Sequence, residues 1–553
     1  MKKQGKNRKI KGKIGLVLTL LLLLTACKSG NSELFSQVSP QAKNENSELF
    51  GQFGQQEKSE NSELLVYGTA QNITEINPIL NEHGELNPLL FNGLTAHAAS
   101  PKNGENGKKG NIIAPDLAEK WDFDPETCTY TFYLAKTTWH DGEPFTSADV
   151  KFTIEAIQRC TQSEIAENFD AVREIALLDE NTISFQLEAP NAAFLDYMAV
   201  PILPRHLLEG EDLEMSSFFK HPVGTGPYRL SAWNEGESLV FQRNEEYFHG
   251  VPNISQIIVK ILPNDAARSL QLRTGELDLA LLPPREAEKF ESLPEFTTYH
   301  METSDYRGIL FNFQNPYWQE NRDLIPAVCC ALDREAMVES ILLGRGIPAY
   351  GPLQRNIYNN PEVERYSYDP ARAEELLQSA GCQKGGDGFY YRHGEKVAFT
   401  ISTPAGDQVR LDLAQAAAQQ LRQVGVDVNV EIPSIVDWAN QSAYLIGWGS
   451  PFDADDHTYK VFSSGGGANY SGYANPLVDR YLTEARRSGD PEVRGEAYDR
   501  FQEALAADPP FAFLCYVDAD YVAVSGLRGI SQDAVLGHHG VGIFWNITEW
   551  VME

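Results

Sequence analysis

The chain lacks the short motifs that identify the common hydrolases and nucleotide-binding enzymes. It contains no Gly-x-Ser-x-Gly elbow, no His-Glu-x-x-His helix and no Walker A loop. Its seven cysteines are scattered without Cys-x-x-Cys spacing, which implies neither a zinc cluster nor a dense disulfide scaffold. Buried free thiols are the expected state of the cysteines beyond Cys27, with an isolated disulfide left open. We therefore expect a binding protein without a cofactor rather than an enzyme.

Positive charge is also scarce. Lysine and arginine number 46 against 77 aspartates and glutamates, so the formal net charge is −31. Seven of the basic residues fall within the first 13 positions, so the chain after residue 26 carries −38. An acidic surface repels nucleic acid, which excludes it as a partner, and is compatible with a cationic or zwitterionic ligand.

Long apolar runs are missing, apart from one short run near the start. The run from Ile14 to Leu24 is shorter than the about 20 residues that a spanning helix needs. With its basic head it indicates a secretory signal peptide over residues 1–26. The sequence Leu24-Thr25-Ala26-Cys27 resembles the bacterial lipobox, in which the cysteine is lipidated. This predicts an anchor at Cys27 on the extracytoplasmic face of the cell membrane.

Residues 27–62 have the composition of a flexible tether. A 15-residue repeat begins with Asn-Ser-Glu-Leu at positions 31 and 46 and begins again at 61. Its Ser, Asn, Gln and Glu residues bury too little apolar surface to offset the entropy of ordering. We expect a lipidated tether that holds a globular body near a membrane.

From residue 63 onward, short β-rich runs alternate with amphipathic helices, which predicts mixed α/β lobes. Strands are expected at Leu65–Thr69, Tyr130–Leu134, Thr182–Leu187, Ile257–Leu262, Gly308–Phe313, Val426–Ile432 and Phe511–Val517. Helices are expected at Ala148–Arg159, Arg334–Leu343, Pro370–Ala380, Gln408–Val424 and Pro491–Ala507. The third of these has an N-cap aspartate, a first-turn proline and a glycine after its end.

Several stretches of the body follow the order of one known family. They include IIAPDLAEKWDFDPETCTYTFYL, WHDGEPFTSADVKFTIEAI, PVGTGPYRL, ALDREAMVESILLGRGIPAYGPL, YSYDPARAEELLQSAG and NYSGYANPLVDRYLTEARRSGDPEVRGEAYDRFQEALAADPPFAFL. Together they resemble the peptide- and nickel-binding ABC-transporter solute-binding proteins, bacterial extracellular solute-binding protein family 5.

The resemblance implies an α/β, two-lobed periplasmic-binding-protein fold of type II, cluster C-like, with an extra subdomain in the first lobe. The first lobe would cover 63–310 with the insertion at about 111–221, the second lobe 311–515, and residues 516–553 would return to the first. The protein would be a monomer that closes on a peptide-like ligand and delivers it to an ABC permease and ATPase complex. A nickel or other metal chelate is the alternative ligand. An extracellular hydrolase and a sensor or adhesion lipoprotein are the rivals from other classes.

The resemblance also places ligand contacts in three regions, and the donor chemistry of imidazole adds one later histidine, His538. These contacts are Glu82, His83, Asp305, Tyr306, Trp448, Ser450, Phe452 and His538. Peptide binders of this family carry an aspartate where this chain has Ser450, and that aspartate pairs with the peptide's α-ammonium group. The string WGSPFDA instead resembles the WGxPYDP string of nickel-chelate binders, which predicts Trp448 and Phe452 as apolar walls and Asp453 as a support of the loop.

Four histidines are candidates for contact with a metal, because a neutral imidazole is a usual donor to nickel. They are His83, His457, His538 and His539. A purely structural role stays open for each of them. On a strand, adjacent side chains point to opposite faces, so at most one of His538 and His539 is expected to contact the ligand.

Overall fold

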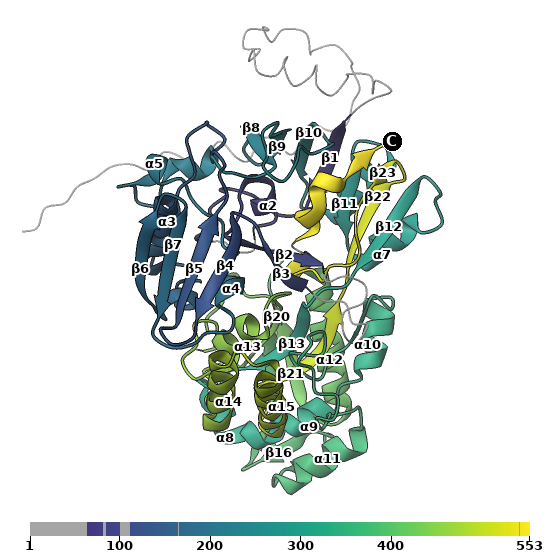
Figure 1. The fold of residues 1–553 in the computed structure, drawn as a ribbon. Coiled ribbons are helices and arrows are strands. Elements are labelled where there is room, and N and C mark those ends of the chain that lie inside the picture. The colour runs from purple at the N-terminus through teal and green to yellow at the C-terminus, as the bar shows by residue number, and fades with distance from the viewer. Residues whose placement is uncertain (1–62, 81–83, 100–110, 164, 439, 541) are drawn as a thin grey trace, which may run out of the picture. The chain divides into compact units, whose positions relative to one another are not determined.

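The computed structural model describes residues 63–553 apart from 81–83, 100–110, 164, 439 and 541 (Figure 1). The predicted signal peptide, Cys27 and the tether lie outside the described residues, as do Glu82 and His83. Within the described part of the chain, no helix combines the length and the apolar character needed to cross a membrane.

A seven-stranded sheet forms the centre of the first lobe, in the order β12-β22-β11-β1-β10-β9-β8 (Figure 1). The strand β1 lies between two parallel neighbours, β10 and β11, while the outer pairs are antiparallel. The strands are β1 (Leu64–Thr69), β8 (Tyr228–Asn234), β9 (Ser238–Arg243), β10 (Gln256–Ile261), β11 (Leu279–Leu282), β12 (Phe296–Met301) and β22 (Ala519–Val524).

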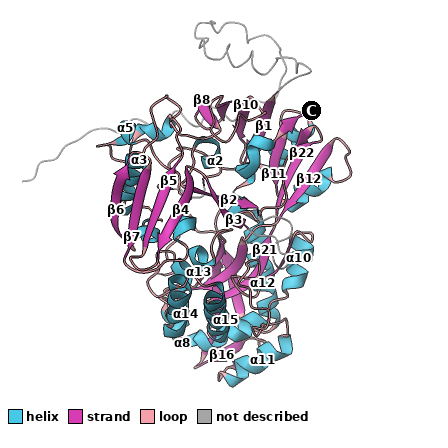
Figure 2. Cartoon of the chain, viewed as in Figure 1, coloured by secondary structure: helices cyan, strands magenta, loops and turns pink. Residues whose placement is uncertain are grey.

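A six-stranded sheet forms the centre of the second lobe, in the order β14-β21-β13-β20-β18-β19. Most of the long helices of the chain gather around this sheet (Figure 2). The strands are β13 (Tyr306–Phe311), β14 (Gly346–Pro348), β18 (Ala398–Ser402), β19 (Asp427–Glu431), β20 (Ala443–Trp448) and β21 (Phe511–Val517). The longer helices are α9 (Ile325–Cys330), α10 (Arg334–Ile341), α11 (Pro370–Ser379), α12 (Gln408–Gln423), α13 (Ala454–Phe462), α14 (Pro476–Arg487) and α15 (Pro491–Ala507).

A separate four-stranded antiparallel sheet, β4-β5-β7-β6, lies within the range where the sequence predicts an inserted subdomain. It is accompanied by the helix α3 (Ser147–Arg159) and the short helix α4 (Phe194–Tyr197). Its strands are β4 (Ala118–Asp124), β5 (Thr129–Leu134), β6 (Val172–Asp179) and β7 (Thr182–Leu187). In β5 and β7 every second residue is buried, as the period of a half-buried strand requires. The pair β2 (Thr95–Ala99) and β3 (Asn111–Pro115) forms a small ribbon of its own.

The chain passes between the two large sheets twice. The first passage joins β12 to β13 through residues 302–305, and the second joins β21 to β22 through Asp518 alone. The buried apolar residues divide at the same places, with one core from residues 306–516 and another from 65–301 and 519–550. The first passage therefore lies earlier than residue 310, because β13 already belongs to the second-lobe sheet.

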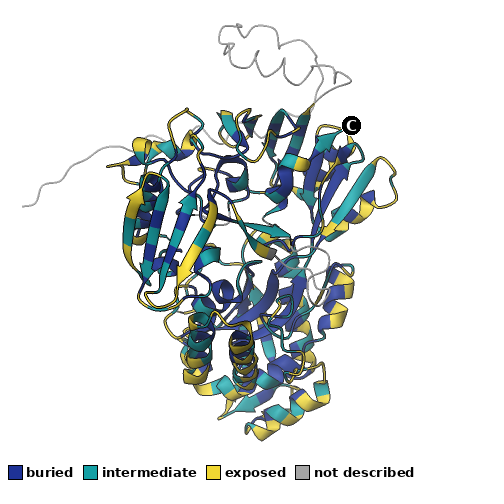
Figure 3. Cartoon of the chain, viewed as in Figure 1, coloured by how far each residue is buried: buried dark blue, intermediate teal, exposed yellow. Residues whose placement is uncertain are grey.

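The predicted strands and helices are confirmed, with ends that differ from the structure by at most two residues. Local signals explain this agreement. The Asp369 carboxylate accepts a hydrogen bond from the Arg372 backbone N–H at 2.9 Å and caps α11, and Gly381 ends that helix with a φ of 85°. Burial also distinguishes central from outer elements: β13 is buried along its whole length, whereas the helices around the sheet expose one side (Figure 3).

Candidate functional site

Two neighbouring cavities lie between the lobes, with volumes of about 450 Å³ and about 220 Å³. The larger is lined by residues of both lobes and of the C-terminal segment, including Asn92, Tyr247, Phe452, Phe544 and Trp545. The smaller is lined by residues that include Ser304, Arg355, Tyr358, Ser450 and His457. Among the described residues, those that line both cavities are His97, Asp196, Pro451, Phe452 and Val535.

The loop between β20 and α13 carries several of these residues into the space between the lobes. Asp453 is the N-cap of α13, and its carboxylate accepts a hydrogen bond from the Asp455 backbone N–H at 2.9 Å. Arg494 donates to the same carboxylate at 2.8 Å. The Ser450 hydroxyl accepts from the Phe452 backbone N–H at 3.3 Å. Asp453 thus supports the loop, as the sequence predicts, and leaves Phe452 to face the cavities.

Phe452 meets a histidine of the first lobe. Its ring stacks on the His97 ring, with centroids 3.6 Å apart and planes 13° from parallel. The His97 Nε2 atom lies 3.1 Å from the Asp196 carboxylate. Burial raises the pKa of this carboxyl, and its hydrogen bond with His97 opposes the increase. The stacked pair therefore joins β2 of the first lobe to the loop of the second.

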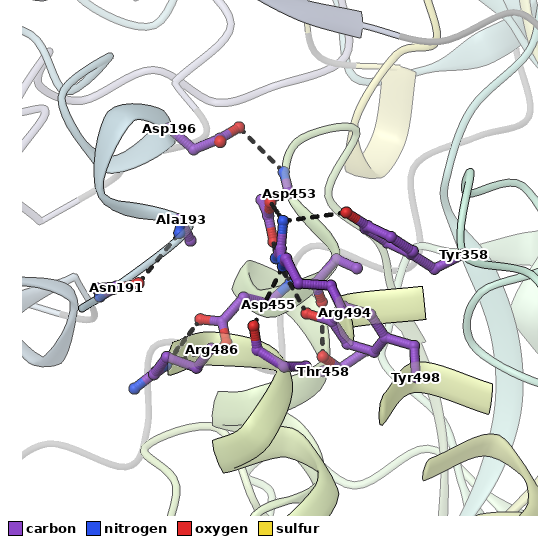
Figure 4. Close-up of polar contacts among 12 residues, drawn as sticks. Asn191, Ala193, Asp196, Tyr358, Asp453, Asp455, Thr458, Arg486, Arg494 and Tyr498 are labelled. Atoms are coloured by element: carbon purple, nitrogen blue, oxygen red, sulfur yellow. Dashed lines mark hydrogen bonds and ion pairs between the residues drawn. The ribbon is translucent and has the colours of Figure 1, made fainter. Parts of the chain in front are cut away.

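Polar contacts extend this junction between the lobes (Figure 4). The Asp453 backbone N–H donates to the Asp196 carboxylate at 3.0 Å, and the Tyr197 hydroxyl donates to the Asp455 carboxylate at 2.6 Å. Arg486 donates to the same Asp455 oxygen at 2.7 Å. Burial and the nearby Asp455 carboxylate raise the pKa of the Tyr197 hydroxyl well above its usual value, so it remains a donor. The carboxylates of Asp196 and Asp455 thus link α4 of the first lobe to the start of α13 in the second lobe.

A second polar cluster surrounds Asp305, beside the first passage between the lobes. The fully buried Asp305 carboxylate accepts hydrogen bonds from the Arg307 guanidinium, from the His538 Nδ1 atom at 2.8 Å and from the His539 backbone N–H at 3.0 Å. Burial alone would raise the pKa of this carboxyl, but the Arg307 guanidinium and the His538 imidazole hold it well below its usual range. Asp305 is therefore an anionic anchor that orients His538.

The two adjacent histidines face the same place. They lie in a 3₁₀ turn rather than a strand, His539 has a left-handed φ of 55°, and the ring centroids are 4.0 Å apart. Their Nε2 atoms lie 3.3 and 3.5 Å from one Arg410 nitrogen, Nη2. The prediction that only one of them could serve the site assumed a strand and is wrong for this geometry. Burial lowers the pKa of the His538 imidazole, and partial loss of solvation together with the neighbouring His538 and Arg307 lowers the pKa of the exposed His539, so both rings are neutral near pH 7.

These groups lie close enough together to hold a metal ion between them. One carboxylate oxygen of Asp305 and one nitrogen of each histidine lie within 4.8 Å of one another. The Nδ1–H of His538 donates to Asp305, as carboxylates orient ligating histidines, and its Nε2 lone pair accepts from Arg410 at 3.3 Å, a contact that a bound metal ion would replace. Gly537, next to His538, lines the larger cavity.

The structure distributes the remaining predicted contacts unevenly. Ser450 and Phe452 line the cavities, whereas Trp448 is half-buried at the end of β20 and packs against the second-lobe core. Tyr306 is fully buried among Phe511, Phe513 and Tyr516. The prediction that Tyr306 contacts the ligand is therefore wrong: its side chain points to the core, while Asp305 and Arg307 point to the cluster with His538.

The fourth histidine candidate is buried in α13. His457 is 2 % exposed, and burial lowers the pKa of its imidazole. It lines the smaller cavity and has no contact with the Asp305 cluster among the described interactions. His457 is therefore a buried residue of the cavity wall, separate from the paired histidines.

Sequence reasoning did not assign a role to His97, Asp196 or Arg410. His97 and Asp196 meet the second lobe only in the folded chain, and nothing near them in the sequence marks that contact. Arg410 follows the helix-capping Asp407 by three residues, which marks a helix start but not a site. The paired histidines were the one local signal, and the flanking Gly537 and Gly540, which the strand-based expectation did not consider, are what could have indicated a turn.

Comparisons with known proteins fit this architecture. The family model described as "Bacterial extracellular solute-binding proteins, family 5 Middle" matches residues 113–470. Protein XP55 of Streptomyces lividans is 34% identical over 480 residues, which is 84% of this chain and 86% of that protein. The oligopeptide-binding protein AppA of Bacillus subtilis is 27% identical over 437 residues, 74% of this chain and 78% of that protein.

A solved structure extends the likeness to three dimensions. It is NikZ from Campylobacter jejuni in complex with Ni(L-His), which superposes with a TM-score of 0.82 at 33% identity. The match covers 89% of this chain and 99% of NikZ. The fold of this chain thus follows an arrangement known from a ligand-bound protein.

Proposed function

The chain belongs to the bacterial extracellular solute-binding proteins of family 5, binding proteins that serve ABC importers with peptide or metal-chelate ligands, and we propose that its own ligand is a small metal chelate. The pair of neutral imidazoles at His538 and His539, backed by Asp305, carries this proposal. Neutral imidazole nitrogen is a preferred donor for nickel and for other late divalent metals of the first row. Likeness to NikZ, solved with Ni(L-His), supports the same reading.

Arg410 complements the imidazoles. Its guanidinium lies within 3.5 Å of both Nε2 atoms, and its neighbour Arg307 is already paired with Asp305. Burial and the charge of Arg307 lower the pKa of Arg410 to about 10, so it is still a cation at neutral pH. Asp407 already pairs with Arg410 at 3.1 Å, and a carboxylate of the chelating molecule would add further charge-assisted hydrogen bonds to the guanidinium, which favours chelators such as amino acids.

An oligopeptide is the second candidate. The larger cavity, at about 450 Å³, has the size of a typical ligand pocket, and AppA, which is 27% identical, is an oligopeptide-binding protein. Ser450 provides no charge for the α-ammonium group that the family's peptide binders pair with an aspartate. A peptide would therefore need another anchor for its amino terminus, which makes the chelate the better-supported ligand.

The location follows from the start of the chain. We propose that residues 1–26 are removed, that Cys27 is lipidated on the extracytoplasmic face, and that residues 27–62 tether a monomeric body close to its permease and ATPase. The changed chain Cys27→Ser would be exported and released into the soluble fraction. Retention of that variant in the membrane fraction would contradict the anchor.

Calorimetry on the full-length chain tests the ligand, with Ni(II) alone, Ni(II) with L-histidine, and peptides as probes. We expect the Ni(II)–histidine probe to bind, and His538→Ala and His539→Ala each to weaken it at least tenfold because each removes a metal donor. His221→Ala is the matched control, since His221 is exposed and outside both cavities. Equal affinity in all three variants would contradict the chelate; peptide cleavage products in the same mixtures, seen by mass spectrometry, would support an enzyme instead.

A further inference from the structure

The two cavities between the lobes meet at five of the described residues, which line both of them. Two of the five are His97 and Phe452, whose rings stack on each other. On one side lies the space of about 450 Å³, and on the other the space of about 220 Å³. The stacked rings therefore lie at the boundary between the two spaces.

The two rings are held differently. Asp196 lies 3.1 Å from the His97 Nε2 atom and also accepts the Asp453 backbone N–H at 3.0 Å, so His97 is fixed by hydrogen bonding. Phe452 has no polar side-chain atom, and its ring is positioned by the stack and by its loop. Each ring comes from a different lobe, so the stacked pair forms only when the lobes meet. Removing the Phe452 ring would open the boundary between the two spaces without breaking a polar contact of a side chain, whereas removing the His97 ring also removes its contact with Asp196.

We propose that the His97–Phe452 pair is a specificity-determining partition, which confines ligands to one cavity and excludes those that are long enough to span both. The inference rests on the proposed function, because it requires that ligands occupy the space between the lobes. Compact chelates and short peptides satisfy the partition, and extended peptides do not. The pair thus limits ligand length within the two cavities, separately from the chemistry of His538 and His539, which line neither of them.

The test compares ligand lengths in the full-length chain. His97→Ala and Phe452→Ala are matched by the controls His221→Ala and Phe123→Ala, which alter exposed residues outside both cavities. Ni(II) with L-histidine, a dipeptide, and an octapeptide that begins with the same two residues serve as probes in calorimetry. Thermal melts by circular dichroism confirm that each variant is folded.

The measured quantity is the ratio of the affinity for the octapeptide to the affinity for the dipeptide. We expect this ratio to be at least tenfold higher in either partition variant than in the unaltered chain and the controls. Where the unaltered chain binds only the chelate, the variants should gain binding of the octapeptide. An unchanged length preference in both folded variants overturns the partition while leaving the proposed function intact. Failure of the unaltered chain to bind any probe overturns the proposed function, and the partition with it.

Discussion

The contact between Tyr197 and Asp455 allows the closure of the lobes to be tested by removing one oxygen atom. Tyr197 lies in α4 of the first lobe and donates at 2.6 Å to a carboxylate of α13 in the second. The change Tyr197→Phe keeps the ring and its packing and deletes only the hydroxyl, which donates to Asp455 and also accepts a long hydrogen bond from Arg486 at 3.5 Å. Asp455 remains paired with Arg486, so no bare charge is left behind.

The size of the effect follows from the kind of bond. A hydrogen bond to a charged acceptor contributes about 1.5–3 kcal/mol, and the remaining ion pair with Arg486 places this one at the lower end. Because the bond exists only when the lobes meet, its loss weakens the closed form relative to the open form. A change of about 1.4 kcal/mol corresponds to about tenfold in an equilibrium constant. We therefore expect Tyr197→Phe to raise the dissociation constant about tenfold, mainly through faster dissociation.

Calorimetry gives the dissociation constant and stopped-flow displacement gives the dissociation rate, each with whichever probe binds the unaltered chain. Tyr133→Phe is the matched control, because the Tyr133 hydroxyl donates at 2.9 Å to Asp122 within a single surface sheet. The control should leave both quantities unchanged. A dissociation constant for Tyr197→Phe within twofold of the unaltered value, or an equal change in the control, would refute the link between this bond and closure.

Two further predictions concern stability. Burial lowers the pKa of His140 to about 4 in the folded chain, where its ring accepts a hydrogen bond from the Gly224 N–H at 3.1 Å. As the pH falls, His140 therefore becomes protonated in the unfolded chain before it does in the folded chain. The free energy of unfolding should therefore fall by about 2–3 kcal/mol between pH 6.5 and pH 4.5 on account of this residue. Urea titrations at several pH values should show a smaller fall for His140→Gln than for the unaltered chain. An equal dependence on pH in the two chains would contradict this role of His140. Arg494→Met leaves the Asp453 carboxylate without its buried partner and should lower the free energy of unfolding by about 3 kcal/mol or more, measured in urea. Adding Asp453→Asn, which keeps the cap, should restore part of that loss, and a double variant as unstable as the single one would count against the ion pair.

The fold was largely predictable because its signals are local. Capping aspartates and prolines mark the helix starts at Asp369 and Asp490, and alternation marks half-buried strands such as β5. These signals depend on neighbouring residues and survive in any lobe arrangement. The position of the first crossing was less predictable, because nothing in the sequence distinguishes a strand that enters the second sheet from a continuation of the first.

The site was predictable only in part, for two physical reasons. The strand β13 is buried on both faces, so its hydrophobic pattern does not tell which side chains point to the core and which to the cluster. Tyr306 and Arg307 were therefore not separable before the structure. The second reason is separation along the chain: His97 and Phe452 are joined only by folding, as are Arg410 and His538.

The two short crossings have a mechanical consequence. Arg355 contacts both crossings. One of its guanidinium nitrogens lies 2.7 Å from the Asp518 carboxylate and donates to the Thr303 carbonyl oxygen at 2.8 Å, so the two crossings can act as one pivot. Leu536 pairs with Thr303 and keeps His538 beside that pivot, while α4 lies to one side of it (Figure 1). A rotation displaces points near its axis least. The imidazoles should thus stay close together while the lobes rotate, so that this site is formed before closure. The Tyr197 contact lies away from the axis and should form last, stabilising the closed form.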